Sequence, residues 1–168
     1  QTAVSRDAGL AMSWWWDTYI DPRNLYDHFK HVAAFVKDMD LRDASRREVE
    51  LTLFPGGGPS VTVIGSAGRT AADLWVYAPD HVALPREGRG PILEDPTAFR
   101  LNGLVDGEYE IAFYDPYTGT WSETETEDVL GGTLRVTIPA TDKDKAIRIR
   151  AVKPPEVRLE DEGGGMGW

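Results

Sequence analysis

The chain has 168 residues and no cysteine, which excludes disulfide bonds and thiolate metal sites. Its formal net charge of −10 argues against a general nucleic-acid-binding protein, because neutralising phosphates requires clustered lysine and arginine. With 41% hydrophobic and 27% charged residues the composition is that of an ordinary globular protein, and no apolar run approaches the roughly 20 residues of a membrane span.

The first predicted element is a strand over residues 9–16, whose sequence is Gly-Leu-Ala-Met-Ser-Trp-Trp-Trp. It is apolar on both faces, which is typical of a parallel sheet covered by helices. Without neighbouring strands its backbone groups would stay unpaired, at about 1–3 kcal/mol each. The chain also opens with Gln1 rather than Met. We therefore expect a processed or partial chain, in which flanking strands come from a missing N-terminal portion, from a second chain or from the later strands.

A helix is predicted next. Asp21 is expected to be its N-cap, Pro22 occupies the first helical position, and the helix is expected to end near Asp40. Apolar residues recur along it at spacings of four and three, which predicts one buried stripe. The stripe consists of Leu25, Phe29, Val32, Val36 and Met39.

From Glu48 onward the hydrophobic period changes to two, which is typical of strands exposed on one face. Residues 79–97 are expected to form a long irregular connection. About eight short strands at this spacing predict an antiparallel β-sandwich. The predicted strands cover residues 48–54, 61–64, 73–77, 98–101, 108–114, 120–125, 133–138 and 146–152. We expect three parts: a barrel-type strand and helix in 1–45, the sandwich in 48–153 and a flexible tail in 154–168.

Residues 9–26, GLAMSWWWDTYIDPRNLY, resemble the last strand, loop and helix of glycoside hydrolases with a (β/α)8 barrel, in the cellulase- and mannanase-like group. Residues 101–119 are similar to a hairpin of the β-sandwich that often follows such barrels. The resemblance implies a mainly β fold, in which one barrel-type βα unit precedes the sandwich and completes a barrel supplied elsewhere. It implies a C-terminal fragment or subunit of a glycoside hydrolase, whose two catalytic glutamates lie on strands that this chain lacks.

The resemblance carries over only to the end of the predicted strand. Trp15 or Trp16 is implied to stack on a sugar ring, and Asp17 to accept hydroxyl hydrogen bonds. Sugar rings present an apolar C–H face to an aromatic plane, and barrel enzymes place their sites at strand ends. The alternatives are that the tryptophans are core or interface residues and that Asp17 is a loop or cap carboxylate. No catalytic residue, metal ligand or cofactor is expected in this chain.

Three further groups of residues could each be either functional or structural. His28 and His31 have a spacing that suits a metal, but a third ligand has no candidate. Three glutamates in the predicted strand 120–125 and just after it suggest either calcium binding or a charged edge strand that opposes aggregation. These are Glu123, Glu125 and Glu127. Four aromatic residues suggest either a polysaccharide-binding patch or core. They are Trp75, Tyr114, Tyr117 and Trp121.

The expected partners are a carbohydrate substrate and the missing barrel portion or a second chain, and the acidic composition fits a secreted or periplasmic protein. Two alternative functions remain. One is a non-catalytic carbohydrate-binding module. The other is a structural or assembly subunit, in which residues 9–36 form only an interface.

Overall fold

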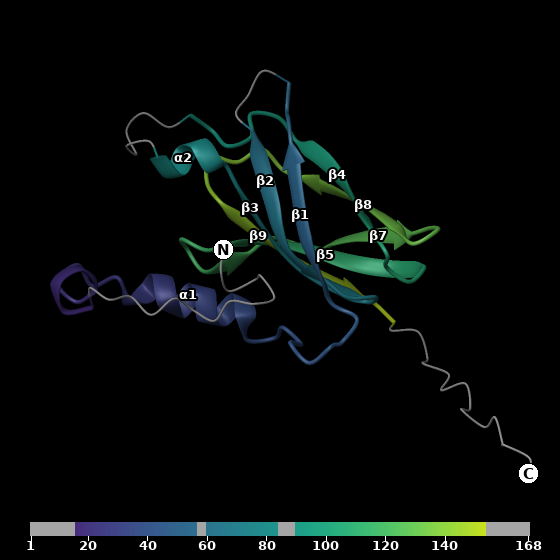
Figure 1. Cartoon of the computed structure of the whole chain (residues 1–168), viewed down its shortest axis with the longest axis horizontal. Coiled ribbons are helices and arrows are strands. Elements are labelled where there is room, and N and C mark those ends of the chain that lie inside the picture. The colour runs from purple at the N-terminus through teal and green to yellow at the C-terminus, as the bar shows by residue number, and fades with distance from the viewer. Residues whose placement is uncertain (1–15, 57–59, 84–89, 154–168) are drawn as a thin grey trace, which may run out of the picture.

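The computed structural model describes residues 16–56, 60–83 and 90–153, which form a mainly β, antiparallel structure (Figure 1). The helical segments in these ranges are η1 (Trp16–Ile20), α1 (Tyr26–Val36) and α2 (Pro79–Ala83). The strands are β1 (Arg47–Leu53), β2 (Val61–Ala67), β3 (Ala71–Tyr77), β4 (Thr97–Asn102), β5 (Gly107–Asp115), β6 (Thr120–Trp121), β7 (Glu125–Val129), β8 (Thr133–Ile138) and β9 (Lys145–Ala151). No helix in the described ranges has the length and apolar character needed to cross a membrane.

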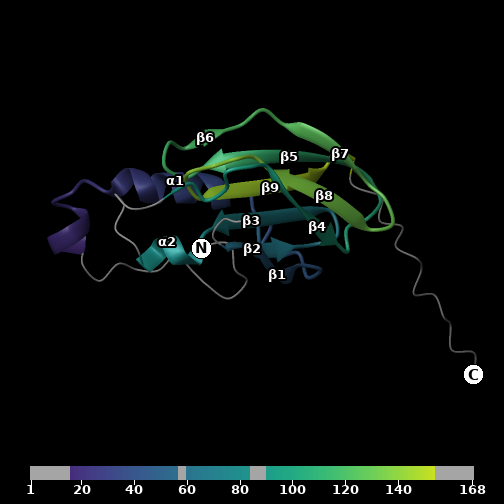
Figure 2. The same cartoon turned by 90° about the horizontal axis from the view of Figure 1, so that it is seen from above.

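The strands form two open sheets, seen from above in Figure 2. The larger has the order β1-β2-β3-β9-β5-β6, and β7 also pairs with β5; the smaller consists of β4 and β8. All the strand pairs are antiparallel. The predicted parallel-type strand over residues 9–16 lies outside the described residues except for Trp16.

One apolar core lies between the two sheets, and alternation along the strands fills it. In β3, Leu74 and Val76 point into this core, whereas Asp73 and Trp75 point to the opposite face. The fully buried core residues contributed by the other strands include Val61, Val63, Leu134, Val136, Ile138, Ile147 and Ile149. Burial of this apolar area is the main force that holds the sheets together.

Helix α1 covers the outer face of the larger sheet. Phe35, which is fully buried, stacks on Tyr114 with ring centroids 5.6 Å apart and meets Trp75 edge-on at 6.5 Å. Met39 and Ala146 complete this second cluster. The Tyr114 hydroxyl donates a hydrogen bond of 3.0 Å to the carbonyl of His31. As a result, β3 is buried on both faces although its sheet is antiparallel.

The structure confirms the antiparallel strands, and Thr133–Ile138 has the predicted bounds. The single strand predicted over 120–125 is wrong, because the chain forms β6 and β7 with a break at residues 122–124. At the break, the Ser122 hydroxyl accepts a hydrogen bond of 3.0 Å from the backbone N–H of Phe113. The connection 79–97 is also less irregular than predicted, since it begins with α2.

The predicted start of the long helix is wrong. Helix α1 begins at Tyr26 rather than at Pro22, and Trp16 belongs to the helical turn η1 rather than to a strand. Asn24 adopts a left-handed backbone conformation (φ 49°), which interrupts the helix and which asparagine tolerates better than most residues. The carboxylate of Asp21 does not cap α1; it accepts a hydrogen bond from the Tyr26 hydroxyl.

Candidate functional site

An exposed aromatic cluster lies at the N-terminal end of α1. Trp16 is 47% exposed, and its ring lies 5.4 Å from that of Tyr26 and 5.7 Å from that of Phe29. We call these three residues the Trp16 cluster. Asp17 is also exposed and follows Trp16 in η1. The structure thus places two of the three predicted sugar-binding residues at the surface, whereas Trp15 lies outside the described residues.

Local contacts hold the segment that carries this cluster. The Asp21 carboxylate accepts the Tyr26 hydroxyl, and this hydrogen bond raises the pKa of Tyr26. Ile20, the last residue of η1, is buried, and the guanidinium carbon of Arg23 lies 4.3 Å from the ring centroid of Tyr19. The exposed aromatic rings are therefore displayed on an ordered turn.

The predicted apolar stripe is only partly covered by the rest of the described chain. Met39 is buried, but Leu25, Phe29 and Val32 are half-buried. Figures 1 and 2 show why: the C-terminal end of α1 lies against the sheet, whereas η1 projects beyond it. Between these two parts, His28 and His31 contact the turn between β5 and β6. Phe35, the fully buried residue of α1, is not among the residues of the predicted stripe. Its spacing of four from Met39 is the sequence signal that could have indicated it.

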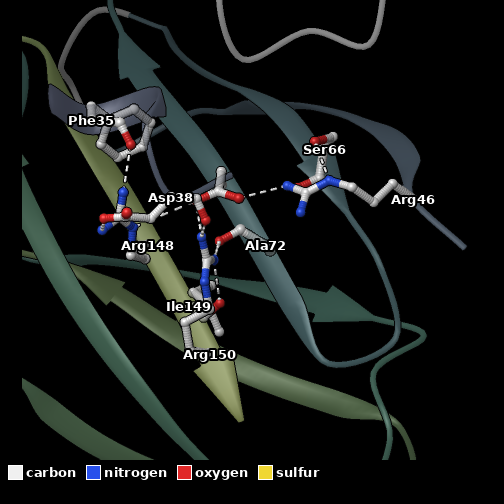
Figure 3. A network of polar contacts seen from close by, with 9 residues as sticks. Phe35, Asp38, Arg46, Ser66, Ala72, Arg148, Ile149 and Arg150 are labelled. Carbon is white, nitrogen blue, oxygen red and sulfur yellow. Dashed lines mark hydrogen bonds and ion pairs between the residues drawn. The ribbon is translucent and has the colours of Figure 1, made fainter. Parts of the chain in front are cut away.

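A buried ionic network lies under the C-terminal end of α1 (Figure 3). Asp73 of β3 is 0% exposed, and its Oδ2 accepts a hydrogen bond of 2.6 Å from Arg46 Nη2. Its Oδ1 lies 2.7 Å from Arg150 Nη2 and 3.8 Å from Arg148 Nε. The Ser66 hydroxyl accepts a further hydrogen bond of 3.0 Å from Arg46 Nε. One carboxylate therefore faces three guanidinium groups.

The same arginines bind the end of the helix. Arg148 donates to the carbonyl of Phe35 and to Asp38 Oδ2, and Arg150 Nη2 lies 3.5 Å from the carbonyl of Asp38. Carbonyls at a helix C-terminus lack partners within the helix, and cations there are favourable. The network thus fixes α1 to the sheet. Sequence reasoning missed it, although its signal is present: Asp73 is a lone charge within the apolar β3, and charged residues alternate with apolar ones in β9.

A hollow of about 520 Å³, which we call the Tyr117 hollow, opens near α2 and the turn between β5 and β6. The Nζ atom of Lys143 lies 5.9 Å from the ring centroid of Tyr117, and the ring of His28 on α1 meets Tyr117 edge-on at 6.4 Å. The indole N–H of Trp75 donates to Asp144 at 3.2 Å. The hollow is lined by His81, Gly90, Pro91, Ile92, Tyr117, Asp142, Lys143 and Asp144.

A second hollow, of about 290 Å³, lies beside Trp121, and we call it the Trp121 hollow. Trp121 is 39% exposed; its ring centroid lies 4.7 Å from that of Tyr114, and the Arg148 guanidinium carbon lies 4.4 Å from it. The hollow is lined by Glu110, Ala112, Trp121, Ser122, Thr124, Arg148 and Arg150.

The structure separates the four aromatic residues of the predicted patch. Trp75 and Tyr114 are buried beneath α1, so they belong to the core. Tyr117 and Trp121 are each 39% exposed and line the two different hollows. Sequence alternation did not reveal this division, because it depends on which part of the outer face the helix covers.

The two histidines of the predicted metal spacing contact the turn between β5 and β6 instead. The Nδ1 atom of His31 lies 3.1 Å from the carbonyl of Pro116, and the ring of His28 contacts Tyr117. Within the described ranges, no three His, Cys, Asp or Glu side chains are grouped so that they could hold a metal. Glu125 and Glu127 are exposed on β7, which among the described strands of the larger sheet pairs with β5 alone, as the edge-strand interpretation expects.

Comparisons with known proteins gave no match, either to a protein-family model or to a curated protein sequence.

Proposed function

We propose that this chain is the C-terminal part of a glycoside hydrolase. In this proposal the two sheets form an accessory β-sandwich, and η1 and α1 belong to the last βα unit of a (β/α)8 barrel. The other barrel strands and both catalytic carboxylates lie on polypeptide outside residues 1–168. The chain alone is therefore not catalytic.

One observation carries the proposal: Phe35 and the arginine network fix the C-terminal end of α1 to the sheet, His28 and His31 contact the turn between β5 and β6, and the Trp16 cluster is left exposed at the other end of the helix. Phe35 is completely buried against the sheet, whereas Trp16, Tyr26 and the half-buried Phe29 are left for another contact. A helix that belongs to two structural units has this distribution, because each unit covers one part of its surface. The resemblance of residues 9–26 to the end of a barrel supports a barrel as the second unit.

The proposed role of Trp16 and Asp17 follows from their place in the barrel. The loops that lead from barrel strands into the helices carry the active site. Trp16 and Asp17 precede α1 by less than a dozen residues and are exposed, so they belong to such a loop. The indole offers a stacking face, and the carboxylate accepts hydrogen bonds from sugar hydroxyls. Hydrolysis itself follows the two-carboxylate scheme, with both carboxylates supplied by the barrel.

The decisive experiment begins with the polypeptide encoded upstream of Gln1. The longer protein is expected to contain seven further barrel strands and to release reducing sugars from a neutral β-mannan or β-glucan. Trp16→Ala and Asp17→Asn are each expected to lower kcat/KM at least about tenfold, the effect of losing about 1.4 kcal/mol of transition-state binding.

The control is Tyr19→Ala, because Tyr19 lies in the same turn and is 51% exposed but packs on Arg23. It is expected to change kcat/KM less than twofold. An upstream sequence without a barrel, or a longer protein that cleaves no glycan, would contradict the proposal.

A second candidate is a non-catalytic carbohydrate-binding module. The Trp121 hollow favours it, because a half-exposed indole lies beside the Ser122 and Thr124 side chains. This function predicts that the isolated chain binds a glycan, that Trp121→Ala abolishes binding and that Trp16→Ala leaves it unchanged. Titration calorimetry with soluble oligosaccharides distinguishes the two candidates.

A further inference from the structure

We infer that the Tyr117 hollow is a second subsite for a neutral glycan chain, separate from the Trp16 cluster. The inference rests on the proposed function and extends it, because it assigns a substrate-binding role to the sheet domain itself. Position, charge and rigidity of the hollow support it.

The position of the hollow follows from the direction of α1. In a (β/α)8 barrel the N-terminal end of each helix lies toward the catalytic face. His28 is in the first turn of α1, and its ring contacts Tyr117 at 6.4 Å. In both views α2, which contributes His81 to the hollow, lies toward the same end of the molecule as η1 (Figures 1 and 2). The Tyr117 hollow is therefore on the substrate side of the proposed enzyme.

The charges in the hollow select neutral sugars over acidic ones. Asp142 and Asp144 outnumber the single ammonium group of Lys143. A uronic acid or a sulfated sugar would meet like charge, which is unfavourable in a partly enclosed site. Neutral hydroxyl groups, by contrast, can donate to the carboxylates and accept from Lys143 or His81. Tyr117 supplies the aromatic surface that sugar C–H groups pack on.

The turn that carries Tyr117 is ordered before any ligand binds. The carboxylate of Asp115 accepts hydrogen bonds from the N–H of Tyr117 at 2.8 Å and of Thr118 at 3.2 Å. Gly119 closes the turn with a φ of 73° and an N–H bond of 2.8 Å to the Asp115 carbonyl. A Cβ at position 119 would lie 2.6 Å from the His31 ring. Such preorganisation lowers the entropic cost of binding.

The Trp121 hollow lacks the position and the available polar groups of the Tyr117 hollow. The Arg148 and Arg150 guanidiniums already donate to backbone carbonyls and to Asp38 and Asp73. The Arg148 guanidinium carbon lies 4.4 Å from the Trp121 ring centroid, closer than Lys143 Nζ lies to the Tyr117 ring centroid (5.9 Å), and so occupies more of the stacking surface. The hollow lies beside the C-terminal end of α1, away from the proposed catalytic face. Because Trp121 and Tyr117 are equally exposed, Trp121→Ala is a matched control.

The first test uses the 168-residue chain and titration calorimetry with mannohexaose, cellohexaose and an oligogalacturonate. We expect binding of a neutral hexasaccharide and none of the oligogalacturonate. Tyr117→Ala is expected to weaken the affinity at least about tenfold, whereas Trp121→Ala changes it less than twofold. Circular dichroism and thermal melts establish that both variants are folded. Unchanged affinity in Tyr117→Ala, loss only in Trp121→Ala, or no neutral glycan bound by the folded wild type would each overturn the inference.

The second test uses the longer enzyme and separates this inference from the proposed function. Tyr117→Ala is expected to raise KM for the polysaccharide several-fold, with kcat/KM for a short aryl glycoside unchanged. If the enzyme is active but polymer KM does not move, the subsite is excluded and the proposed function stands. If no glycan is hydrolysed, the proposed function fails, and the calorimetric result alone decides whether the hollow binds sugar.

Discussion

Asp73 is a buried carboxylate on which three arginine side chains converge. A fully buried carboxylate is costly unless it is paired and hydrogen-bonded, and three buried or half-buried guanidiniums face it. Arg46 and Arg150 make direct contacts, whereas Arg148 Nε lies 3.8 Å away and has no hydrogen-bond partner within the described residues. The carboxylate and the arginines therefore neutralise each other's buried charge.

Replacing this carboxylate should therefore destabilise the chain strongly. We expect Asp73→Asn to lower the free energy of unfolding by about 3–5 kcal/mol, because it leaves buried cations without a counter-charge. Asp38→Asn is the control: Asp38 also contacts Arg148 but is 61% exposed, so its loss should cost at most about 1 kcal/mol. Urea denaturation at pH 7 measures both, and equal effects of the two substitutions would contradict this account.

Asp115 predicts a dependence of stability on pH. Burial acts to raise its pKa, but hydrogen bonds from the N–H groups of Tyr117 and Thr118, with Lys145 at 3.7 Å, outweigh burial and lower it. Because the folded-state pKa is lowered, the stabilisation is present above the unfolded-state pKa of roughly 4 and is lost as the pH falls through the lower folded value.

We expect Asp115→Asn to reduce the free energy of unfolding by about 1 kcal/mol at pH 7, and the difference from wild type to shrink below about pH 4. Denaturation between pH 2.5 and 7 measures this, with Glu108→Gln on the same strand as the exposed control. A difference that stays constant across this range would refute the assignment.

At the scale of elements, Phe35 is the aromatic residue of α1 that is most deeply buried against the sheet. Phe35 contacts the rings of Trp75, Tyr114 and Trp121. We expect Phe35→Ala to cost about 3–5 kcal/mol, because it leaves a cavity between helix and sheet. Phe29→Ala should cost much less in this chain, since Phe29 is half-buried and its one aromatic ring contact within the described ranges is with Trp16.

The measurements are urea denaturation and the near-ultraviolet circular dichroism of the aromatic cluster. If Phe29→Ala lowers the free energy of unfolding as much as Phe35→Ala, the Phe29 side chain is already packed within this chain. The proposal that the Trp16 cluster contacts a barrel would then lose its support.

At the scale of the whole molecule, β3 links two apolar clusters, because its side chains pack into one cluster on each face of the strand. Leu74 and Val76 belong to the core between the sheets, and Trp75 belongs to the cluster under α1. A strand that joins two clusters couples their unfolding. We therefore expect residues 26–151 to unfold in one cooperative transition.

Differential scanning calorimetry tests this expectation, because a two-state transition gives equal calorimetric and van't Hoff enthalpies. A separate low-temperature transition that is lost when α1 is deleted would show instead that the helix folds independently.

The sequence by itself determined most of the sheet. Alternation with a period of two located the strands to within a few residues, because an antiparallel strand that covers one core must place apolar side chains on every second position. It failed at 120–125, where the Ser122 hydroxyl accepts a hydrogen bond from the Phe113 N–H at the break between β6 and β7, and at Pro22, where the left-handed Asn24 prevents the helix from starting. These failures are local, and each depends on one residue whose conformation the pattern does not encode.

Only the tertiary structure decided where the candidate site residues lie. Trp75 and Trp121 are both tryptophans in strands, yet α1 buries one and leaves the other at the rim of a hollow. Asp73, Arg148 and Arg150 meet because antiparallel pairing brings β3 and β9 side by side on the face that the helix covers. Burial and charge pairing are properties of packed surfaces, and residues far apart in the chain create them together.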